Sequence, residues 1–282
     1  MRVTTADIRG YKERRERFAC LTAYDVVTAR IADAVGIPLL LVGDSLGMVV
    51  LGYENTIPVT LDDILHHTRA VVRGTTRALV VADLPFMTYH RSTAQAIESA
   101  GRCMQEGGAQ AVKLEGGRAT AGTVARLTAI GIPVMGHVGL TPQSVHQLGG
   151  FKVQGKTGER ARALIQDALA LQDAGAFSIV LECVPAEIAR RVTERLVVPS
   201  IGIGAGPHCD AEIQVVSDIL GWVPDFVPKH TKPYAHLADA ARDAVIRYRD
   251  EVLARSFPGA AQSFSVSEEV LRELDDALSN LS

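Results

Sequence analysis

Short apolar runs alternate with helix-like segments along most of the chain. Each run predicts a strand that is buried on both faces. The runs cover residues 18–24, 38–44, 79–83, 111–115, 133–137, 177–182, 198–203 and 214–220. Helices are expected between them, for example over 26–35 and 159–174, and another begins at Thr60 with Asp63 in the capping-box position. Eight strands that alternate with helices predict either a closed barrel or a doubly wound sheet.

Five of the runs end in a polar residue. These residues are Asp44, Asp83, Glu115, His137 and Glu182. A carboxylate in the middle of a buried strand would carry a large desolvation penalty, so it belongs at the end of the strand. In a barrel the carboxyl ends of all strands face one site, whereas in an open sheet only the switch-point strands do. Polar ends on strands two to six therefore favour an α/β fold of the (β/α)8 or TIM barrel type.

The length of 282 residues fits one such barrel, which typically has about 250 residues. We expect a single catalytic barrel domain over 1–254, including an N-terminal closing segment and a last helix over 237–253. Residues 255–282 are expected to form a linker and an amphipathic helix that follows a capping box of Ser265 and Glu268. The apolar stripe of this helix must pack on its own barrel or on a neighbouring subunit. The stripe consists of Val270, Leu274, Leu278 and Leu281.

Composition and charge exclude several classes of function. A net charge of −3 and a pI of about 6.2 leave no basic excess for nucleic acid or an anionic membrane surface. No apolar stretch approaches the roughly 20 residues that span a bilayer, and no apolar core of a signal peptide is found at the start. The four cysteines include no C-x-x-C pair, so neither disulfides nor a cysteine metal site is expected. We therefore expect a cytoplasmic protein.

Asp44, Asp83 and Glu115 offer only oxygen ligands, and they come from three neighbouring strand ends. An all-carboxylate set suits a hard cation, which favours Mg²⁺ over Zn²⁺. Any one of these acids alone is explained more simply as a helix cap or as the partner of an arginine. Three acids at equivalent strand ends make the metal-binding interpretation the better one, and they predict a magnesium site.

Three further strand-end residues have a catalytic and a structural interpretation each. Lys113 lies two residues from Glu115, so both point to the same side of their strand, where Lys113 could hold a substrate carboxylate, pair with the acid or form a Schiff base. Glu182 has apolar neighbours in sequence, which suits either a general base or a buried, paired acid. His137 could donate a hydrogen bond or hold a carboxylate, although a lone histidine is more often a core residue.

Two connections also stand out. Residues 139–158 are long and rich in Gly, Gln and Lys, and loops of this length in a compact domain are often functional. Residues 202–206, Gly-Ile-Gly-Ala-Gly, resemble a phosphate-cradling loop after strand seven. They lack the G-x-G-x-x-G spacing of a dinucleotide site, and close packing of the backbone explains them equally well.

Nine short stretches in this order resemble one enzyme family. They are LTAYD (21–25), VGDSLG (42–47), PVTLD (58–62), ADLPF (82–86), VKLEGG (112–117), GHVGLTPQ (136–143), GGFKVQG (149–155), LECVP (181–185) and IGIGAG (201–206). Together they extend over about residues 18–235, and they are similar to the ketopantoate hydroxymethyltransferase family. The tail from about residue 260 lies outside the resemblance.

The resemblance implies a (β/α)8 barrel that transfers a one-carbon unit from 5,10-methylenetetrahydrofolate to 3-methyl-2-oxobutanoate, giving ketopantoate for pantothenate and coenzyme A synthesis. It implies that Asp44, Asp83 and Glu115 hold Mg²⁺ and that Glu182 accepts the proton. The keto acid would bind against Asp44, Ser45, Asp83 and Lys113, and we add His137 to this set. Members of the family assemble as decamers, so a homo-oligomer is expected.

Other functions remain open at this point. A metal-dependent lyase or mutase of a phosphorylated three-carbon acid would use the same barrel, with phosphate donors at residues 204–206 and no folate. A non-catalytic metabolite-binding barrel would keep Lys113 and the acids but would not exchange the substrate proton. A class I aldolase would use Lys113 as its imine-forming amine.

Overall fold

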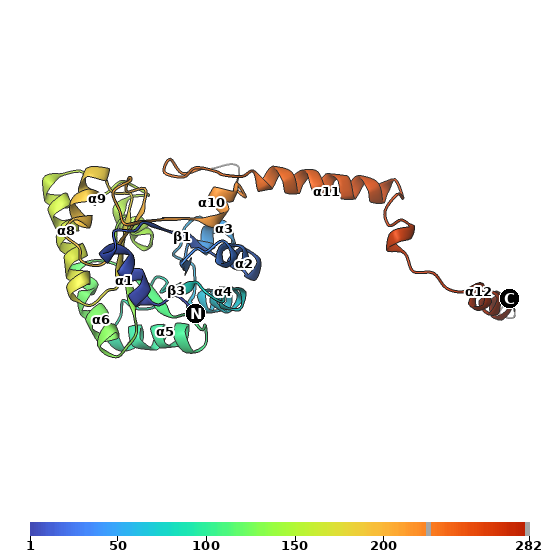
Figure 1. Cartoon of the computed structure of the whole chain (residues 1–282), viewed down its shortest axis with the longest axis horizontal. Helices are drawn as coiled ribbons and strands as arrows, with labels where there is room; N and C mark the ends of the chain where they lie inside the picture. The colour runs from blue at the N-terminus through green and yellow to red at the C-terminus, as the bar shows by residue number, and fades with distance from the viewer. Residues whose placement is uncertain (224–226, 280–282) are drawn as a thin grey trace. The chain divides into compact units, whose positions relative to one another are not determined.

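The computed structural model describes residues 1–223 and 227–279, and its contacts divide the chain into two units, Met1–Ala235 and His236–Ser282 (Figure 1). The first unit contains all the strands of the sheet. Helix α11, Leu237–Leu253, falls in the second unit. The sequence pattern instead predicts this helix as the last element of a barrel domain over 1–254.

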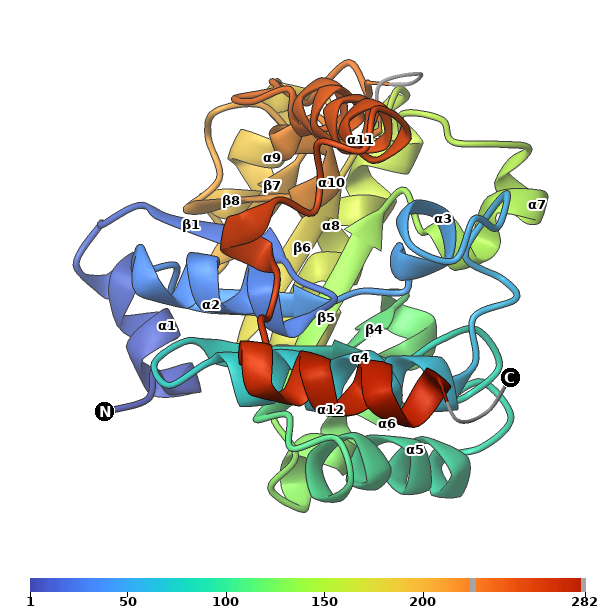
Figure 2. The ribbon, with the colours of Figure 1, turned by 90° about the vertical axis from the view of Figure 1, so that its right-hand side faces the viewer.

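Eight parallel strands close into a barrel, because β1 pairs with both β2 and β8. The strands are β1 Phe18–Thr22, β2 Leu39–Val42, β3 Leu79–Asp83, β4 Ala111–Glu115, β5 Val134–Gly139, β6 Ser178–Glu182, β7 Ser200–Ile203 and β8 Ala211–Gln214. Helices lie around the outside of the strands (Figure 2). The predicted (β/α)8 barrel is confirmed.

The helices of this unit are α1 Thr5–Glu13, α2 Val26–Ala34, α3 Leu46–Val49, α4 Leu61–Gly74, α5 Thr93–Gln105, α6 Arg118–Ala129, α7 Val145–Leu148, α8 Gly158–Asp173, α9 Ala186–Thr193 and α10 Val216–Leu220, with a 3-10 turn η1 at Pro142–Ser144. The capping box of α4 forms as predicted: the Thr60 hydroxyl accepts from the Asp63 N–H, and the Asp63 carboxylate accepts from the Thr60 N–H. Thr4 and Asp7 make the same box at the start of α1, which the sequence analysis did not assign as a helix.

The eighth strand lies earlier in the chain than the apolar run suggests. The prediction of a strand over 214–220 is wrong, because β8 covers Ala211–Gln214 and residues 216–220 form helix α10. In β8 only Ala211 and Ile213 are buried, so the strand alternates instead of forming a continuous apolar run. The connection from β7 is described throughout and forms no helix, so the alternation of elements fails there too.

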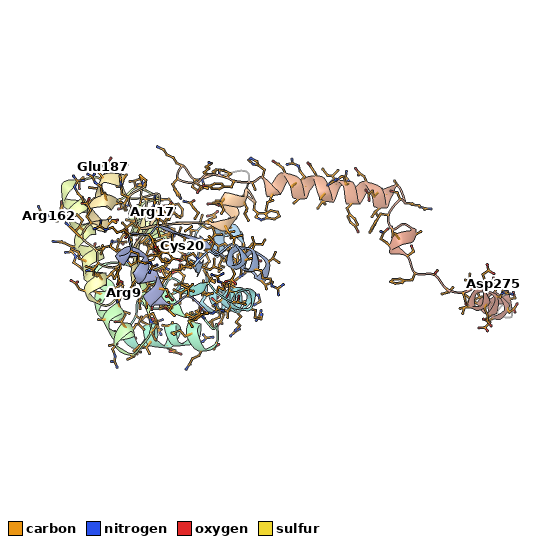
Figure 3. The ribbon with its side chains drawn as sticks, viewed as in Figure 1. Arg9, Arg17, Cys20, Arg162, Glu187 and Asp275 are labelled. Carbon is orange, nitrogen blue, oxygen red and sulfur yellow. The ribbon has the colours of Figure 1, made fainter. Side chains whose placement is uncertain are left out.

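The interior of the barrel is filled by alternate strand residues. They are Phe18, Cys20, Leu39, Leu41, Leu79, Val81, Ala111, Met135, Val180, Ile201, Ala211 and Ile213. Figure 3 labels Cys20 among the crowded side chains of this unit and Arg162 and Glu187 at its edge. Residues two apart on a strand share a face, so the polar residues two positions after Val81, Ala111, Met135 and Val180 point into the mouth of the barrel.

Asp33 joins helix α2 to the start of β3. Its buried carboxylate accepts hydrogen bonds from the backbone N–H groups of Thr76, Arg77 and Ala78 at 2.7 to 3.0 Å, and from the Thr76 hydroxyl at 3.0 Å. Burial raises the pKa of Asp33, but the hydrogen bonds from Thr76, Ala78 and Arg77 outweigh it and lower the pKa below its ordinary value. The ionised carboxylate therefore stabilises the fold.

Asp33→Asn is expected to lower the free energy of unfolding by about 2 kcal/mol at pH 7, because an amide accepts these bonds less well than a charged carboxylate. A depressed folded pKa gives stability that is present above the unfolded pKa, about 3.9, and is lost as the pH falls through the folded pKa. The difference in the free energy of unfolding between wild type and variant should therefore become smaller in acid. Urea denaturation at pH 7 and pH 3 measures it, with Asp62→Asn, on the exposed face of α4, as control. An equal gap at both pH values would contradict this role.

The second unit contains α11, a 3-10 turn η2 at Ala260–Gln262, and α12 at Glu268–Ser279. The Ser267 hydroxyl accepts a hydrogen bond from the Val270 N–H, so Ser267 takes the capping position expected of Ser265. Val270, Leu274 and Leu278 are about half exposed, at 48 to 53%. Leu281 lies outside the described residues. Neither α11 nor α12 has a buried residue, so the predicted burial of the stripe is not found in the single chain.

Across the described ranges 1–223 and 227–279, every helix is too short or too polar to cross a bilayer.

Candidate active site

The strand ends bring the predicted polar residues together in one mouth of the barrel. Asp83, Glu115 and Glu182 are the last residues of β3, β4 and β6. Lys113 and His137 each lie two residues before the end of their strands, β4 and β5, and Asp44 follows β2. All of these side chains are at most 5% exposed except that of Glu182, which is 19% exposed. The sequence analysis expected apolar surroundings for Glu182, but in the structure this acid lies at the more open side of the cluster.

Lys113 is held in an ion pair with Asp83. Its Nζ lies 2.8 and 2.7 Å from the two Asp83 carboxylate oxygens and 3.9 Å from Glu115 Oε1. Burial lowers the pKa of Lys113, but the charges of Asp83, Glu115 and Asp44 outweigh it and raise the pKa above its ordinary value. A Schiff-base lysine needs a neutral amine, so this geometry favours a role in charge balance or anion binding over imine formation.

Asp44 is buried between two other acids. Its backbone N–H donates to Asp83 Oδ2 at 3.2 Å. Burial and the charges of Asp83 and Glu115 raise the pKa of Asp44 well above its ordinary value. No arginine pairs with the three predicted metal acids among the residues that the structure describes, so the simpler arginine-partner interpretation does not hold for them.

His137 bridges Glu115 and Glu182. Its Nδ1 lies 3.5 Å from Glu115 Oε1, and its Nε2 lies 3.3 Å from Glu182 Oε2. Burial and the Lys113 charge lower the pKa of His137, but the two carboxylates outweigh them and raise it to about 9. The raised pKa favours the charged imidazolium at neutral pH, and the ring lies between the two carboxylates without hydrogen-bond geometry to either of them.

Ser45 lies directly after Asp44, at the start of α3. The hydroxyls of Ser45 and Tyr24 are 2.8 Å apart and share a hydrogen bond. Burial raises the pKa of Tyr24, so its hydroxyl stays protonated and can donate. Sequence reasoning did not select Tyr24, although it lies in the first of the family-like stretches.

Gln143 and Tyr89 complete the cluster, and sequence reasoning missed both. Gln143 Nε2 donates to Asp44 Oδ2 at 2.9 Å, and its backbone N–H donates to Glu115 Oε2 at 3.1 Å. The Tyr89 hydroxyl donates to Gln143 Oε1 at 2.8 Å. Gln143 lies in the long connection after β5, so the expectation that this connection contributes to the site fits its position.

A family model described as ketopantoate hydroxymethyltransferase matches residues 2–260. The chain belongs to the ketopantoate hydroxymethyltransferase family. It is 57% identical over 280 residues to the 3-methyl-2-oxobutanoate hydroxymethyltransferase of Dehalococcoides mccartyi strain 195, covering 99% of both chains. It is 58% identical over 263 residues to the enzyme of that name from Chloroflexus aurantiacus, covering 93% of both chains. The resemblance is thus confirmed, and the protein is an enzyme of this family.

Solved structures with the same fold are more distant in sequence. A phosphonopyruvate hydrolase is similar with a TM-score of 0.58 and 13% identity, over 100% of this chain and 98% of that chain. A 2,3-dimethylmalate lyase is similar with a TM-score of 0.55 and 17% identity, over 99% and 100%. At these identities the likeness shows the barrel alone, and it gives no support to a lyase or mutase activity.

The acids of this hydroxymethyltransferase-family site fit a hard divalent cation in donor type and charge. With every group ionised, Asp44, Asp83, Glu115 and Glu182 outweigh Lys113 and His137 by two negative charges. Within the described part of the chain no group donates a hydrogen bond to the buried Glu115 Oε1, although His137 Nδ1 lies 3.5 Å away. Lys113 engages both oxygens of Asp83, and no three His, Cys, Asp or Glu side chains within 1–223 and 227–279 already stand in metal-holding geometry. The acids therefore fit a divalent cation by their oxygen donors and their charge, and not by a ligand geometry that is already formed.

A cavity of about 620 Å³ lies along the turn that follows Glu182. Cys183, Gly204, Gly206, Lys229 and His230 help to line it. A Cβ at Gly206 would overlap Ala186, so close backbone packing accounts for that glycine of the 202–206 loop.

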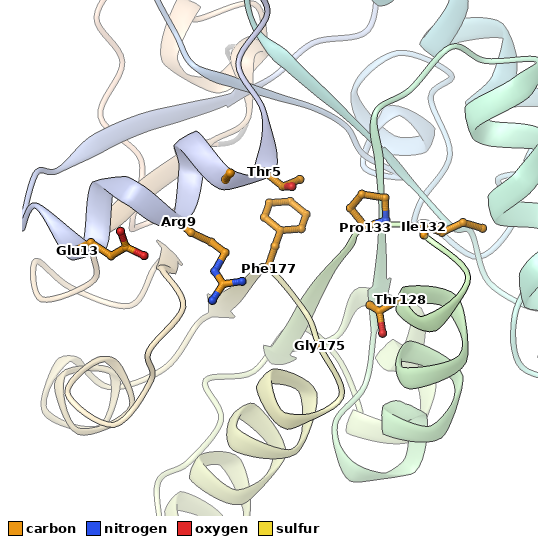
Figure 4. Close-up of a pocket in the computed structure, with 10 residues that line it drawn as sticks. Thr5, Arg9, Glu13, Thr128, Ile132, Pro133, Gly175 and Phe177 are labelled. Carbon is orange, nitrogen blue, oxygen red and sulfur yellow. The ribbon is translucent and has the colours of Figure 1, made fainter.

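A second cavity, of about 540 Å³, lies at the opposite end of the barrel (Figure 4). Thr5, Arg9 and Glu13 of α1 line it together with Pro133 and Phe177, which directly precede β5 and β6. None of the predicted site residues lies there, so the chemistry belongs to the other end.

Proposed function

We propose that this enzyme transfers a one-carbon unit from 5,10-methylenetetrahydrofolate to 3-methyl-2-oxobutanoate as a hydroxymethyl group, consuming one water and giving ketopantoate and tetrahydrofolate, and so acts in pantothenate and coenzyme A synthesis. Membership of the ketopantoate hydroxymethyltransferase family carries this proposal. The buried cluster of carboxylates, ammonium and imidazolium at the barrel mouth supports it, because proton abstraction beside a carbonyl needs a base and a means of stabilising negative charge.

Asp44, Asp83 and Glu115 would hold Mg²⁺ as the cofactor. When bound, the cation acts as a Lewis acid and stabilises the negative charge that develops on the keto oxygen. The three carboxylates supply the oxygen ligands that this ion prefers. The raised pKa of Asp44 supports the assignment, because a bound cation would offset the repulsion among these three acids.

Glu182 is the proposed proton acceptor. It is the most open acid of the cluster, and His137 Nε2 lies 3.3 Å from its carboxylate. The charged imidazole would attract one carboxylate oxygen and leave the other to face C3 of the keto acid. Removing the C3 proton gives a carbon nucleophile. Water supplies the hydroxyl oxygen: it hydrolyses the two C–N bonds of the folate methylene group, which leaves tetrahydrofolate as formaldehyde. C3 then adds to the formaldehyde carbon, and the proton held by Glu182 completes the CH2OH group.

Lys113 and Ser45 are proposed to hold the keto acid. Lys113 carries a buried positive charge that can bind the substrate carboxylate, and Ser45 offers a hydroxyl that Tyr24 already orients. With both ends fixed, C3 is held close to Glu182, which lowers the entropic part of the barrier. Asp44, Asp83 and His137 complete the proposed surroundings of the substrate.

We propose a cytoplasmic homo-oligomer, a decamer as in the family resemblance, with small molecules as its partners and neither nucleic acid nor membrane. The half-exposed stripe of α12 supports assembly, since apolar side chains left in water forgo about 1.5–3 kcal/mol each. Native mass spectrometry of the full chain tests the oligomer.

Proton NMR of 3-methyl-2-oxobutanoate in D₂O tests the proposed reaction. With Mg²⁺ alone, the C3 proton should exchange for deuterium. With 5,10-methylenetetrahydrofolate added, ketopantoate should form. Exchange without product would contradict the folate donor, and the absence of both would favour a binding barrel. Turnover of a phosphorylated three-carbon acid instead would favour a lyase or mutase.

A further inference from the structure

Gln143 lies at the centre of the acidic cluster although it carries no charge. It belongs to the 3-10 turn η1 after β5 and is 4% exposed. Its contacts reach the ends of β2, β3 and β4, through Asp44, Leu84 and Glu115. One neutral residue thus connects four consecutive strand ends of the barrel.

The hydrogen bonds of Gln143 use all of its amide hydrogens. Nε2 donates one hydrogen to Asp44 Oδ2 and the other to the Leu84 carbonyl oxygen, both at 2.9 Å. The backbone N–H donates to Glu115 Oε2 at 3.1 Å. Two of the three proposed metal acids therefore receive a hydrogen bond from the same residue, on an oxygen that is then turned toward Gln143.

Tyr89 fixes the orientation of the Gln143 amide. Tyr89 is buried, and its hydroxyl donates to Gln143 Oε1 at 2.8 Å. The same hydroxyl accepts from the Glu115 N–H at 3.2 Å and lies 3.2 Å from the Glu115 carbonyl oxygen. If the amide turned by 180°, Oε1 would face two acceptors, the Asp44 carboxylate and the Leu84 carbonyl. Only the observed orientation satisfies the network.

We infer that Gln143 is a positioning residue, which holds Asp44 and Glu115 in the orientation that binds the divalent cation, and that Tyr89 acts through Gln143. The inference rests on the proposed function of these two acids as cation ligands. Without the side-chain amide, the Asp44 carboxylate can turn away from Glu115, which keeps its bond from the backbone N–H, since like charges repel strongly in a buried site. Hydrogen-bond partners of metal ligands typically change metal affinity by about 10- to 100-fold.

Gln143→Met tests the inference, because methionine keeps the length of the side chain and leaves the backbone bond to Glu115 in place. The Mn²⁺ dissociation constant, measured on the full chain by electron paramagnetic resonance, should rise at least about 10-fold. In the assay, the Mn²⁺ concentration for half-maximal rate should rise in parallel, and excess Mn²⁺ should restore most of kcat. A merely structural role would lower stability without this rescue by metal.

Gln110→Met is the matched control. Gln110 is half-buried just before β4, at the opposite end of the barrel, where it bonds the Val80 N–H and the Gly108 carbonyl. Its Mn²⁺ affinity should equal that of wild type. Wild-type affinity in Gln143→Met, or the same loss in Gln110→Met, would overturn the inference.

Tyr89→Phe supplies a second test that does not depend on the folding of Gln143→Met. It should weaken Mn²⁺ binding in the same direction, and the double variant should lose less than the two single losses combined. Full additivity would overturn the link from Tyr89 to Gln143.

The metal measurement also separates this inference from the proposed function. Mn²⁺ binding that depends on Gln143, in a protein without hydroxymethyl transfer, would refute the function alone. Hydroxymethyl transfer together with unchanged binding in both variants would refute the inference alone.

Discussion

Glu182→Gln should slow exchange of the C3 proton of 3-methyl-2-oxobutanoate into D₂O by about 10²- to 10⁴-fold, the usual cost of losing a positioned general base. The substitution keeps the shape of the side chain and its place 3.3 Å from His137, but it removes the basic oxygen. Binding of Mg²⁺ and of the keto acid should persist, because Glu182 is not among the proposed ligands. Exchange without folate isolates proton removal from one-carbon transfer.

Glu187→Gln is the matched control for this experiment. Glu187 lies on the exposed side of α9, five residues after Glu182, so the same change of charge there should leave exchange at the wild-type rate. Wild-type exchange in Glu182→Gln would show that Glu182 is structural. His137 would then be the next candidate base, although two carboxylates raise its pKa to about 9 and favour its charged form.

The barrel was predictable because its strands are buried on both faces and therefore stand out as apolar runs. The same rule failed at β8, which alternates and which no helix separates from β7. Helix α1 was also missed, although Thr4 and Asp7 form the capping box that signals its start. The pattern of apolar residues thus located the strands that are buried in the core. It missed or misplaced elements whose position depends on local hydrogen bonds or on a single buried face.

The charged part of the site was predictable for a simple reason. An ionisable residue that ends a buried strand must point into the barrel mouth, so Asp83, Lys113, Glu115 and His137 had to meet. Gln143 is different, because it is neutral and lies on a loop whose path no pattern determines. The stretch GHVGLTPQ contained it, but only the folded chain shows which carboxylates it contacts.

The surroundings of Glu182 could not be read from its neighbours in sequence. The apolar residues beside it belong to the strand and to the turn that follows, while the carboxylate itself is 19% exposed and faces a charged imidazole. Helix α12 is a similar case. Its amphipathic pattern was predictable from the sequence, but the surface that packs against its apolar stripe was not. Residues beside Glu182 in sequence therefore do not show which groups surround its carboxylate in the folded protein.

Removing divalent cations is expected to abolish both proton exchange and hydroxymethyl transfer, and added Mg²⁺, Mn²⁺ or Co²⁺ should restore them. The keto acid is an anion, and without a cation it would enter a buried cluster of four acids and two basic groups, in which burial and the neighbouring acids already raise the pKa of Asp44. Proton NMR of chelator-treated protein, before and after metal is added back, measures both activities. Full turnover in metal-free protein would remove the metal assignment altogether.

Asp44→Asn extends this test to a single ligand. Asparagine keeps the size of the side chain but removes one negative charge, so Mn²⁺ affinity should fall by more than the roughly 10- to 100-fold that loss of a partner of a metal ligand produces. Keto-acid affinity should fall with it, whereas Glu182→Gln should spare both. Asp25→Asn, at the exposed N-cap of α2, controls for the loss of one charge. If Asp44→Asn bound both ligands normally, Asp44 would carry no part of the site, and the acids would have to be reassigned around Glu115.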